Sequence, residues 1–192
     1  MHALVRNTAS FGHAHDQLTV FQGSALDHDD IAQAMQGCDA VVSTLNVSMA
    51  SHFPWAKVLS PPDLMSASIK NATSVMKEQG LKRIVVMSSN GATETWSHLP
   101  AIYRGLANIS NIKVIMQDHT RQEAILAGTD LDWTALRPVG LNDKKIKPLD
   151  EVTVSFDRNP KPAMMVARSV IAEYIVKTLE NDLHIHERPT LS

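Results

Sequence analysis

The sequence of 192 residues has little of several features that mark particular classes of protein. It holds one cysteine, Cys38, and so can form no internal disulfide, which fits a reducing compartment. Lys and Arg number 18 against 20 Asp and Glu, a formal net charge of −2, so no basic excess favours nucleic acid or an anionic membrane surface. No apolar run approaches the roughly 18 residues of a membrane span, and Arg6 follows too few apolar residues for a signal peptide. These absences predict a cytoplasmic protein with no nucleic-acid or membrane partner.

What is present is the composition of a globular protein. Hydrophobic residues make up 44% and charged residues 20% of the chain, both close to average. A chain of this length can bury one sizeable core. Because it contains no internal repeat, no low-complexity segment and no linker, we predict a single domain over residues 1–192.

The hydrophobic pattern alternates between short and long periods. Short β-branched runs predict strands at Ala3–Arg6, Leu18–Gln22, Asp39–Leu45, Arg83–Ser88, Trp133–Arg137 and, less clearly, Val152–Phe156. Helical spacing with stop signals predicts helices at Asp29–Met35, Asp63–Gln79, His119–Ala127 and Ala167–Leu179. Strands separated by helices build βαβ units. The pattern therefore predicts an α/β fold with three layers and a doubly wound, mostly parallel sheet.

Polar residues follow most of the predicted strands. They are Arg6–Asn7, Gly23–Ser24, Thr44–Asn46, Ser88–Asn90 and Arg137. Ligands of an open parallel sheet bind beyond the carboxyl ends of its strands. Hydroxyls, amides and two arginines at this edge suit an anionic ligand with many hydrogen-bonding groups, and a nucleotide is the candidate.

Five segments resemble a known family when they are taken in order. They are L-V-R-N, Q-G-S-A-L-D, G-C-D-A-V-V-S-T-L, G-L-K-R-I-V-V-M-S-S-N-G-A and L-D-W-T-A-L-R-P. Together they resemble the atypical short-chain dehydrogenases/reductases with an NAD(P)-binding Rossmann domain, nearest to the NmrA-like and the biliverdin-IXβ and flavin reductase-like branches. The resemblance extends from about Ala3 to Leu179 and implies a cofactor, NADP(H) in preference to NAD(H), with no metal.

The resemblance also implies roles for individual residues. Arg6 would hold the 2′-phosphate, for which a guanidinium fork is suited, and Ser89 would lie beside the reacting ring as the catalytic residue. Trp55, in a loop over Ser51–Pro62, and His119 would contact the substrate. The full set of implied cofactor contacts is Arg6, Asn7, Ser24, Ala25, Leu45, Asn46, Met87, Ser88, Pro138 and Val139.

The sequence departs from the family at its beginning. The family opens with a strand and a G-x-x-G-x-x-G loop that cradles the pyrophosphate, whereas Met1 falls at the start of the family's second strand. The family's first strand and helix are thus missing from the sequence as given. Two alternatives follow: the given sequence starts downstream of the natural start, which we favour, or Ala3–Arg6 moves over to pair with Ala40–Leu45.

The sequence also lacks the family's proton donors. Val139 stands where biliverdin-reductase-like members place a His, and Tyr103 is followed four residues later by Ala107 instead of the Lys of Tyr-x-x-x-Lys. Reduction of a flat conjugated acceptor, a flavin or a quinone, needs no protein acid, because the proton can come from water. The sequence therefore predicts an NAD(P)H-dependent reductase of this kind. The alternative is a non-catalytic NAD(P)-binding sensor of NmrA-like type, and whether the protein is an enzyme stays open.

Simpler interpretations compete for several residues. Arg137 is interpreted as structural, with its head paired to an acidic residue, and Cys38 as a small core residue. A solvent-facing helix position is favoured for His119 over a substrate contact. The pairs His13/His15 and His184/His186 have no metal-site spacing and are predicted to be solvated. The expected partner is a small-molecule substrate, and the expected state is a monomer or homodimer.

Overall fold

The computed structural model describes residues 1–12, 15–51, 53–144 and 152–192. The strands are β1 His2–Val5, β2 Thr19–Gln22, β3 Ala40–Ser43, β4 Arg83–Met87, β5 Asp132–Pro138, β6 Gly140–Asn142, β7 Val154–Ser155, β8 Met165–Ala167 and β9 Thr190–Leu191. The α-helices are α1 His28–Met35, α2 Leu64–Gln79, α3 Ala101–Asn108, α4 Ile112–Ala127 and α5 Arg168–Glu180, and short 3-10 helices cover Thr8–Ser10 (η1) and Thr93–His98 (η2).

The largest sheet has five strands in the order β3-β4-β5-β9-β7. The pairs β3-β4, β4-β5 and β5-β9 are parallel, and only β7 joins this sheet antiparallel. Each of the six residues from Trp133 to Pro138 in β5 is buried. Parallel strands with both faces covered read as continuous apolar runs, which is why β4 and β5 were recognisable in the sequence. The predicted α/β fold with a mostly parallel sheet is confirmed.

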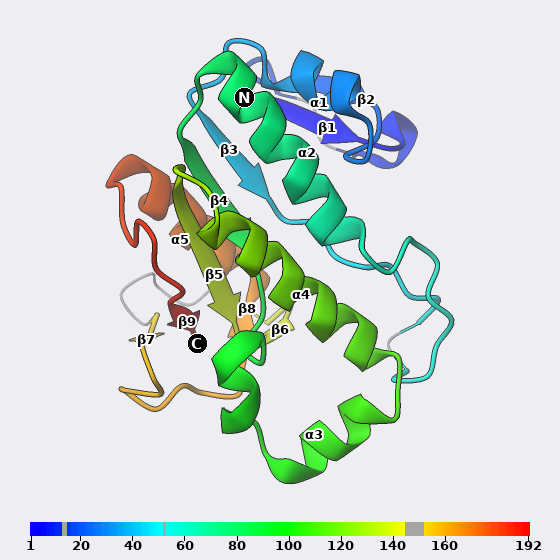
Figure 1. Cartoon of the computed structure of the whole chain (residues 1–192), viewed down its shortest axis with the longest axis vertical. Coiled ribbons are helices and arrows are strands. Elements are labelled where there is room, and N and C mark those ends of the chain that lie inside the picture. The colour runs from blue at the N-terminus through cyan, green and yellow to red at the C-terminus, as the bar shows by residue number, and fades with distance from the viewer. Residues whose placement is uncertain (13–14, 52, 145–151) are drawn as a thin grey trace.

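Helices cover the two faces of this sheet unequally (Figure 1). On the face of α2 and α4, the core includes Ile69, Met76, Ile84, Leu126 and Trp133. On the opposite face, α5 packs Val170, Ile171 and Tyr174 against β4 and β5, where Val85 and Leu136 are fully buried. Three layers result, with β4 and β5 in the middle.

The first two strands form a sheet of their own. β1 pairs with β2 in parallel from His2 opposite Thr19 to Val5 opposite Gln22. Among the described residues β1 does not pair with β3, so the less favoured alternative, in which Ala3–Arg6 pairs with Ala40–Leu45, is wrong. α1 holds the small sheet in place by packing against both β1 and α2. β3 therefore forms one edge of the main sheet, where Val42 is 43% exposed.

Helix boundaries differ from the predictions mainly around α4. This helix begins at Ile112, seven residues before the predicted start at His119. Its apolar stripe is interrupted because Asp118, His119, Gln122 and Glu123 occupy buried positions. The sequence pattern also missed α3, which contains Gly105 and begins directly after Pro100. Within the described residues, no helix combines the length and the apolarity needed to cross a membrane.

Candidate active site

The carboxyl ends of β3, β4 and β5 lie next to one another, because these strands are parallel neighbours in register. The segments at this edge are Leu45–Asn46, Ser88–Ser89 and Pro138–Val139, in which Ser89 is the predicted catalytic residue and the others are predicted cofactor contacts. The main chain after β4 stays joined to β5, since Ser88 N–H donates to the Leu136 carbonyl at 2.7 Å and Asn90 N–H to the Pro138 carbonyl at 3.1 Å. The structure thus brings three of the predicted segments to one edge.

The two serines after β4 have different environments. Ser88 is buried, and its hydroxyl donates to the Glu123 carboxylate at 2.5 Å. Ser89 is half-buried, and its hydroxyl makes only a long contact of 3.4 Å to the Asn90 carbonyl. The Ser88 hydroxyl is therefore committed to the fold, whereas the Ser89 hydroxyl is available to a bound molecule.

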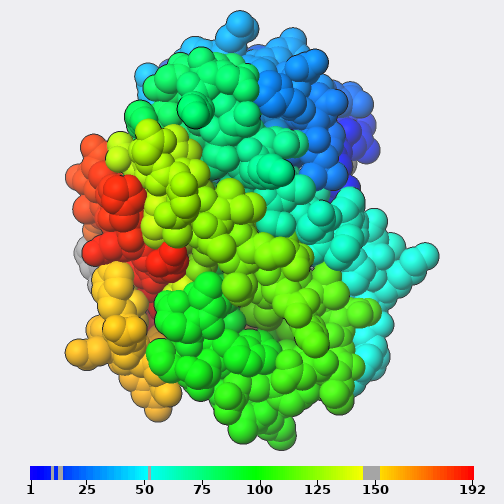
Figure 2. All heavy atoms as spheres, in the orientation of Figure 1, coloured from blue at the N-terminus to red at the C-terminus, as the bar shows by residue number. Residues whose placement is uncertain are grey.

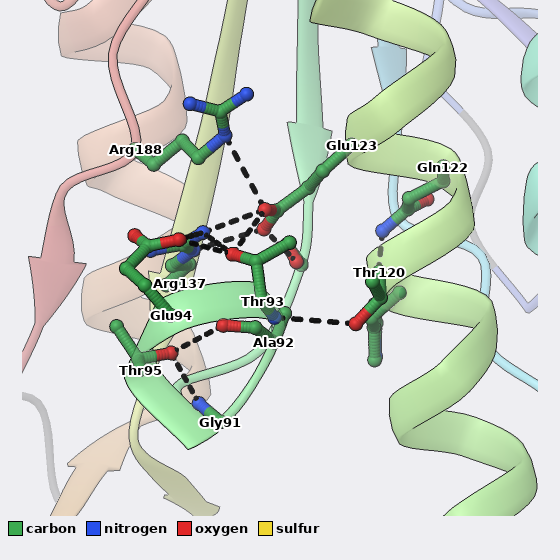
Figure 3. A network of polar contacts seen from close by, with 12 residues as sticks. Gly91, Ala92, Thr93, Glu94, Thr95, Thr120, Gln122, Glu123, Arg137 and Arg188 are labelled. Atoms are coloured by element: carbon green, nitrogen blue, oxygen red, sulfur yellow. Dashed lines mark hydrogen bonds and ion pairs between the residues drawn. The ribbon is translucent and has the colours of Figure 1, made fainter. Parts of the chain in front are cut away.

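Glu123, Arg137, Glu94 and Arg188 form an ionic network (Figure 3), and Ser88 joins it through its hydrogen bond to Glu123. Glu123 of α4 is fully buried and accepts from Arg137 Nε at 2.9 Å and from Arg137 Nη2 at 2.6 Å. Arg137 of β5 is 1% exposed and donates from Nη1 to Glu94 of η2 at 2.5 Å. Arg188 Nε approaches Glu123 at 3.3 Å. The prediction of a structural, acid-paired Arg137 agrees with this geometry. The network ties β4, β5, α4 and η2 together behind the site.

The loop between β4 and η2 carries the strain of this arrangement. Thr93 has φ of 48°, which is unusual for a β-branched residue. Its hydroxyl contacts both Arg137 Nη2 and the Glu94 carboxylate, so the network holds it in this conformation. Hydrogen bonds from Arg137 lower the pKa of Glu94 to about 2, and Glu94 is therefore ionised at neutral pH.

α4 also presents His119 and Gln122 toward the end of β4. Gln122 Nε2 donates to the Met87 carbonyl at 3.0 Å and lies 2.9 Å from His119 Nδ1. His119 is 4% exposed, so the favoured interpretation as a solvent-facing residue is wrong. Burial lowers the pKa of His119 to about 4. The ring is therefore neutral at pH 7 and cannot supply a proton as an imidazolium.

The other predicted cofactor contacts lie at the ends of β1 and β2. Arg6 is exposed and makes no ion pair among the described residues. Asn7 accepts from Ala9 N–H with its side chain and begins η1. Ser24 N–H donates to the Asp30 carboxylate at 2.7 Å, and Asp30 packs so closely over Gly23 that an added Cβ would meet its Cγ at 2.6 Å. Arg6 is thus free for a phosphate, while the turn at Gly23 and Ser24 already has a carboxylate above it.

The helix N-termini at these edges are capped by carboxylates of the chain itself. Asp27 accepts from the Asp29 and Asp30 amides at the start of α1. Asp118, fully buried in α4, accepts from Met65 N–H at 2.7 Å and Ser66 N–H at 3.3 Å at the start of α2. Anions bind helix N-termini through free amides, and these amides are already used. Of an NADP molecule, the 2′-phosphate end fits Arg6 and the nicotinamide end fits the edge at Ser89, whereas neither N-terminus fits the pyrophosphate.

The backbone after β5 is mostly engaged as well. Val139 N–H donates to the Leu191 carbonyl at 3.0 Å, and Val139 is 8% exposed. The Pro138 carbonyl accepts from Asn90 and keeps a second lone pair. A carboxamide would therefore meet the acceptor of Pro138 and not the donor of Val139.

The loop with Trp55 lies beside the start of α4. Trp55 is 47% exposed and donates from Nε1 to the Ile109 carbonyl at 2.8 Å. Its ring is tilted by 46° against that of Phe53, with the centroids 5.3 Å apart. Asn111 anchors the same loop by donating to the Pro54 and Ala56 carbonyls. In the space-filling view this segment protrudes at the side of the molecule next to α3 and α4 (Figure 2). Trp55 thus anchors its loop and still exposes half of its ring.

His184, His186 and Cys38 make their contacts within the fold. His184 lies 2.8 Å from the Tyr174 hydroxyl and 2.9 Å from Glu187, and His186 lies 2.9 Å from the Leu131 carbonyl. His15 is described but His13 lies outside the described residues. Among the residues that the structure describes, no group of His, Cys, Asp and Glu could hold a metal ion. Cys38 is half-buried next to His2, and burial raises the pKa of its thiol.

Sequence reasoning missed the central residues of this site. Glu123 and Glu94 were not predicted, and neither was the capping carboxylate of Asp118. Glu123 stands four residues after His119 on the helix that borders the site. An acidic residue in a helix that packs on a buried strand is the signal that could have pointed to it. Its partner could not be identified, since Arg137 belongs to another element.

Comparisons with known proteins identify the family and the fold. A family model described as NAD(P)H-binding matches residues 1–182. The fold is similar to that of ChuY, an anaerobillin reductase from Escherichia coli O157:H7, with a TM-score of 0.77 and 20% identity over 99% of this chain and 82% of that chain. A short-chain dehydrogenase/reductase from Veillonella parvula, solved in complex with NADP, has a TM-score of 0.70 and 15% identity over 100% of this chain and 81% of that chain. The oxidoreductase ylbE from Lactococcus lactis has a TM-score of 0.75 and 14% identity over 99% and 78%. No curated protein sequence matches.

Proposed function

Because the chain belongs to the NAD(P)H-binding family, we propose that it is an NADPH-dependent reductase that transfers hydride to a flat conjugated acceptor such as a flavin or a quinone. One observation carries the proposal. The carboxyl ends of β3, β4 and β5 meet at one edge, where the Ser89 hydroxyl makes only one long contact and remains available. Ligands of open parallel sheets bind at such an edge.

The residues at this edge have separate tasks in the proposal. NADPH, when bound, supplies the hydride. Arg6 pairs with the 2′-phosphate, since a guanidinium fork matches phosphate oxygens, and Leu45–Asn46 lie along the cofactor toward Ser89. Ser89 orients the acceptor by a hydrogen bond, and Ser24, Ala25, Met87 and Ser88 line the cofactor through their backbones.

The proton that accompanies the hydride comes from water in this proposal. His119 is neutral and buried, and burial raises the pKa of Tyr103. Neither residue supports acid catalysis at neutral pH. The contribution of the chain to the reaction is then position and electrostatic environment, which are large effects in hydride transfer.

A second candidate is an NAD(P)-binding sensor without turnover. Two observations favour it. Among the described residues no proton donor is found beside Ser89, and the N-termini of α1 and α2 are capped. The two candidates differ in one measurable property, because both bind the dinucleotide but only the reductase oxidises it.

The test has two steps with the purified chain. Titration with NADPH and NADH, followed by nicotinamide fluorescence, measures binding and cofactor preference. FMN or duroquinone is then added, and loss of the near-ultraviolet absorbance of NADPH measures turnover. Binding with turnover that falls in Ser89→Ala supports the reductase, and binding without turnover supports the sensor. If neither nucleotide binds, both proposals fail.

The proposal also includes a compartment, a partner and an oligomeric state. We infer a cytoplasmic protein that acts on a small molecule as a monomer or homodimer. A near-neutral net charge of −2 and the single cysteine support this setting. Sedimentation of the purified chain measures its oligomeric state.

A further inference from the structure

A cavity lies next to the Arg137–Glu94 pair, and both residues line it. It has a volume of about 200 Å³ and lies between η2, β7 and β9. Asn90 and His98 line it on one side, and Ser155, Phe156 and Thr190 on the other. All of its lining residues belong to the described part of the chain. The proposed cofactor edge does not include them.

The wall of this cavity contains buried polar atoms without partners. His98 Nδ1 and Ser155 Oγ form no hydrogen bond with any of the described residues, and both residues line the cavity. Ser155 is 1% exposed. Leaving a buried polar group unpaired is costly, so two such atoms around one space point to a bound molecule that pairs with them.

The charges around the cavity exclude an ionic ligand. Arg137 is paired with Glu94 and Glu123, and Arg188 approaches Glu123, so two arginines face two glutamates. At the rim, the adjacent Asp157 and Arg158 carry opposite charges. An anion would meet the carboxylates, and a cation would meet the guanidinium groups of the arginines.

The cavity also offers apolar surface for a ring. Phe156 is 42% exposed and Pro162 is half-buried, and both line the same space. The Arg188 guanidinium is itself held by stacking at 4.8 Å over the Trp133 ring, so its Nε is fixed in position. A ligand for this wall has a flat apolar body and an oxygen acceptor.

We propose that this cavity binds a small uncharged ring compound that carries a carbonyl group. The carbonyl oxygen accepts from the Ser155 hydroxyl, His98 pairs with a second polar group of the ligand, and the ring packs on Phe156. This binding does not depend on the proposed reductase activity.

The test uses benzamide as the neutral probe and benzoate as its anionic counterpart of equal size. Binding is measured by calorimetry and by protein NMR shifts at pH 7. We expect benzamide to bind with a Kd of about 1 mM, typical of a fragment with few hydrogen bonds, and benzoate to bind at least about tenfold more weakly. Equal or tighter binding of benzoate would overturn the proposal, and so would the absence of saturable binding of benzamide, which would mean that the cavity holds only water.

Two variants test whether the probe binds in the cavity. Ser155→Ala removes one partner and should weaken benzamide binding about threefold to tenfold, and His98→Phe should weaken it to a similar extent. Ser74→Ala, an exposed position on α2, is the matched control and should leave binding unchanged. An unchanged Kd in both cavity variants would refute the site even if benzamide binds.

Titration with NADPH in the same preparation separates this proposal from the reductase. Benzamide binding without NADPH binding supports the cavity and refutes the proposed function. NADPH binding without benzamide binding refutes the cavity proposal and supports the proposed function.

Discussion

The substitution Glu123→Gln tests the buried network most directly. Glu123 is fully buried and receives the Ser88 hydroxyl, two nitrogens of Arg137 and the approach of Arg188 Nε. Glutamine keeps the size of the side chain but replaces one carboxylate oxygen by an amide nitrogen. That nitrogen would face N–H groups of Arg137, and the buried guanidinium would lose its fully buried counterion.

The magnitude follows from the burial of both partners. Removing one member of a buried ion pair typically costs about 3–5 kcal/mol of folding free energy. Glu94 remains to compensate part of the charge of Arg137, so we expect the lower end, about 3 kcal/mol. That is a large share of the roughly 5–15 kcal/mol by which most domains are stable.

Urea unfolding at pH 7 measures this loss as a lower midpoint with an unchanged slope. The surface pair of Lys82 and Asp130 provides the control, and Lys82→Gln should leave the midpoint unchanged within error. The double variant Glu123→Met/Arg137→Met should be more stable than Glu123→Gln, because no unpaired charge stays buried. A loss below about 1 kcal/mol, the range of exposed pairs, would refute the reasoning.

Further predictions concern a pKa, a cofactor contact and a close approach. The folded-state pKa of His119 is lowered to about 4, so its contribution to stability is complete above pH 6.5 and is lost as the pH falls toward 4. In an NMR titration the His119 ring should stay neutral at pH 5.5. His28, whose pKa is raised by Glu78, should be protonated at the same pH. Arg6→Ala should abolish the preference for NADPH over NADH in fluorescence titrations, and a retained preference would remove Arg6 from its role. In thermal unfolding, Gly23→Ala should destabilise the fold by about 1–3 kcal/mol through its clash with a neighbouring carboxylate, whereas Gly105→Ala, with open space in α3, should stabilise it by about 0.5–1 kcal/mol.

The sequence predicted the elements whose signals are local. Each predicted strand is present to within about two residues, except that only Val154–Ser155 of the last one is a strand. The reason is that burial on both faces leaves an uninterrupted apolar run, as in Ile84–Met87. The end of α2 was predictable for a similar reason, since Gly80 adopts φ of 73°, which glycine accommodates without strain. Once the strands were predicted, the polar residues that follow them could be identified directly from the sequence.

The tertiary structure decided which polar residues are available and which are committed. Ser88 and Ser89 are adjacent and identical in type, yet one hydroxyl is bound by Glu123 and the other is available, because only one of two successive side chains after a strand faces α4. In the same way, the pairing of Arg137 depends on Glu123 and Glu94, which lie 14 and 43 positions away on other elements. Periodicity reports which face of an element is covered, but the identity of a charged group's partner is fixed only when separate elements pack together. The sequence alone therefore determined an α/β chain with a polar strand edge, and packing determined the chemistry that remains open at that edge.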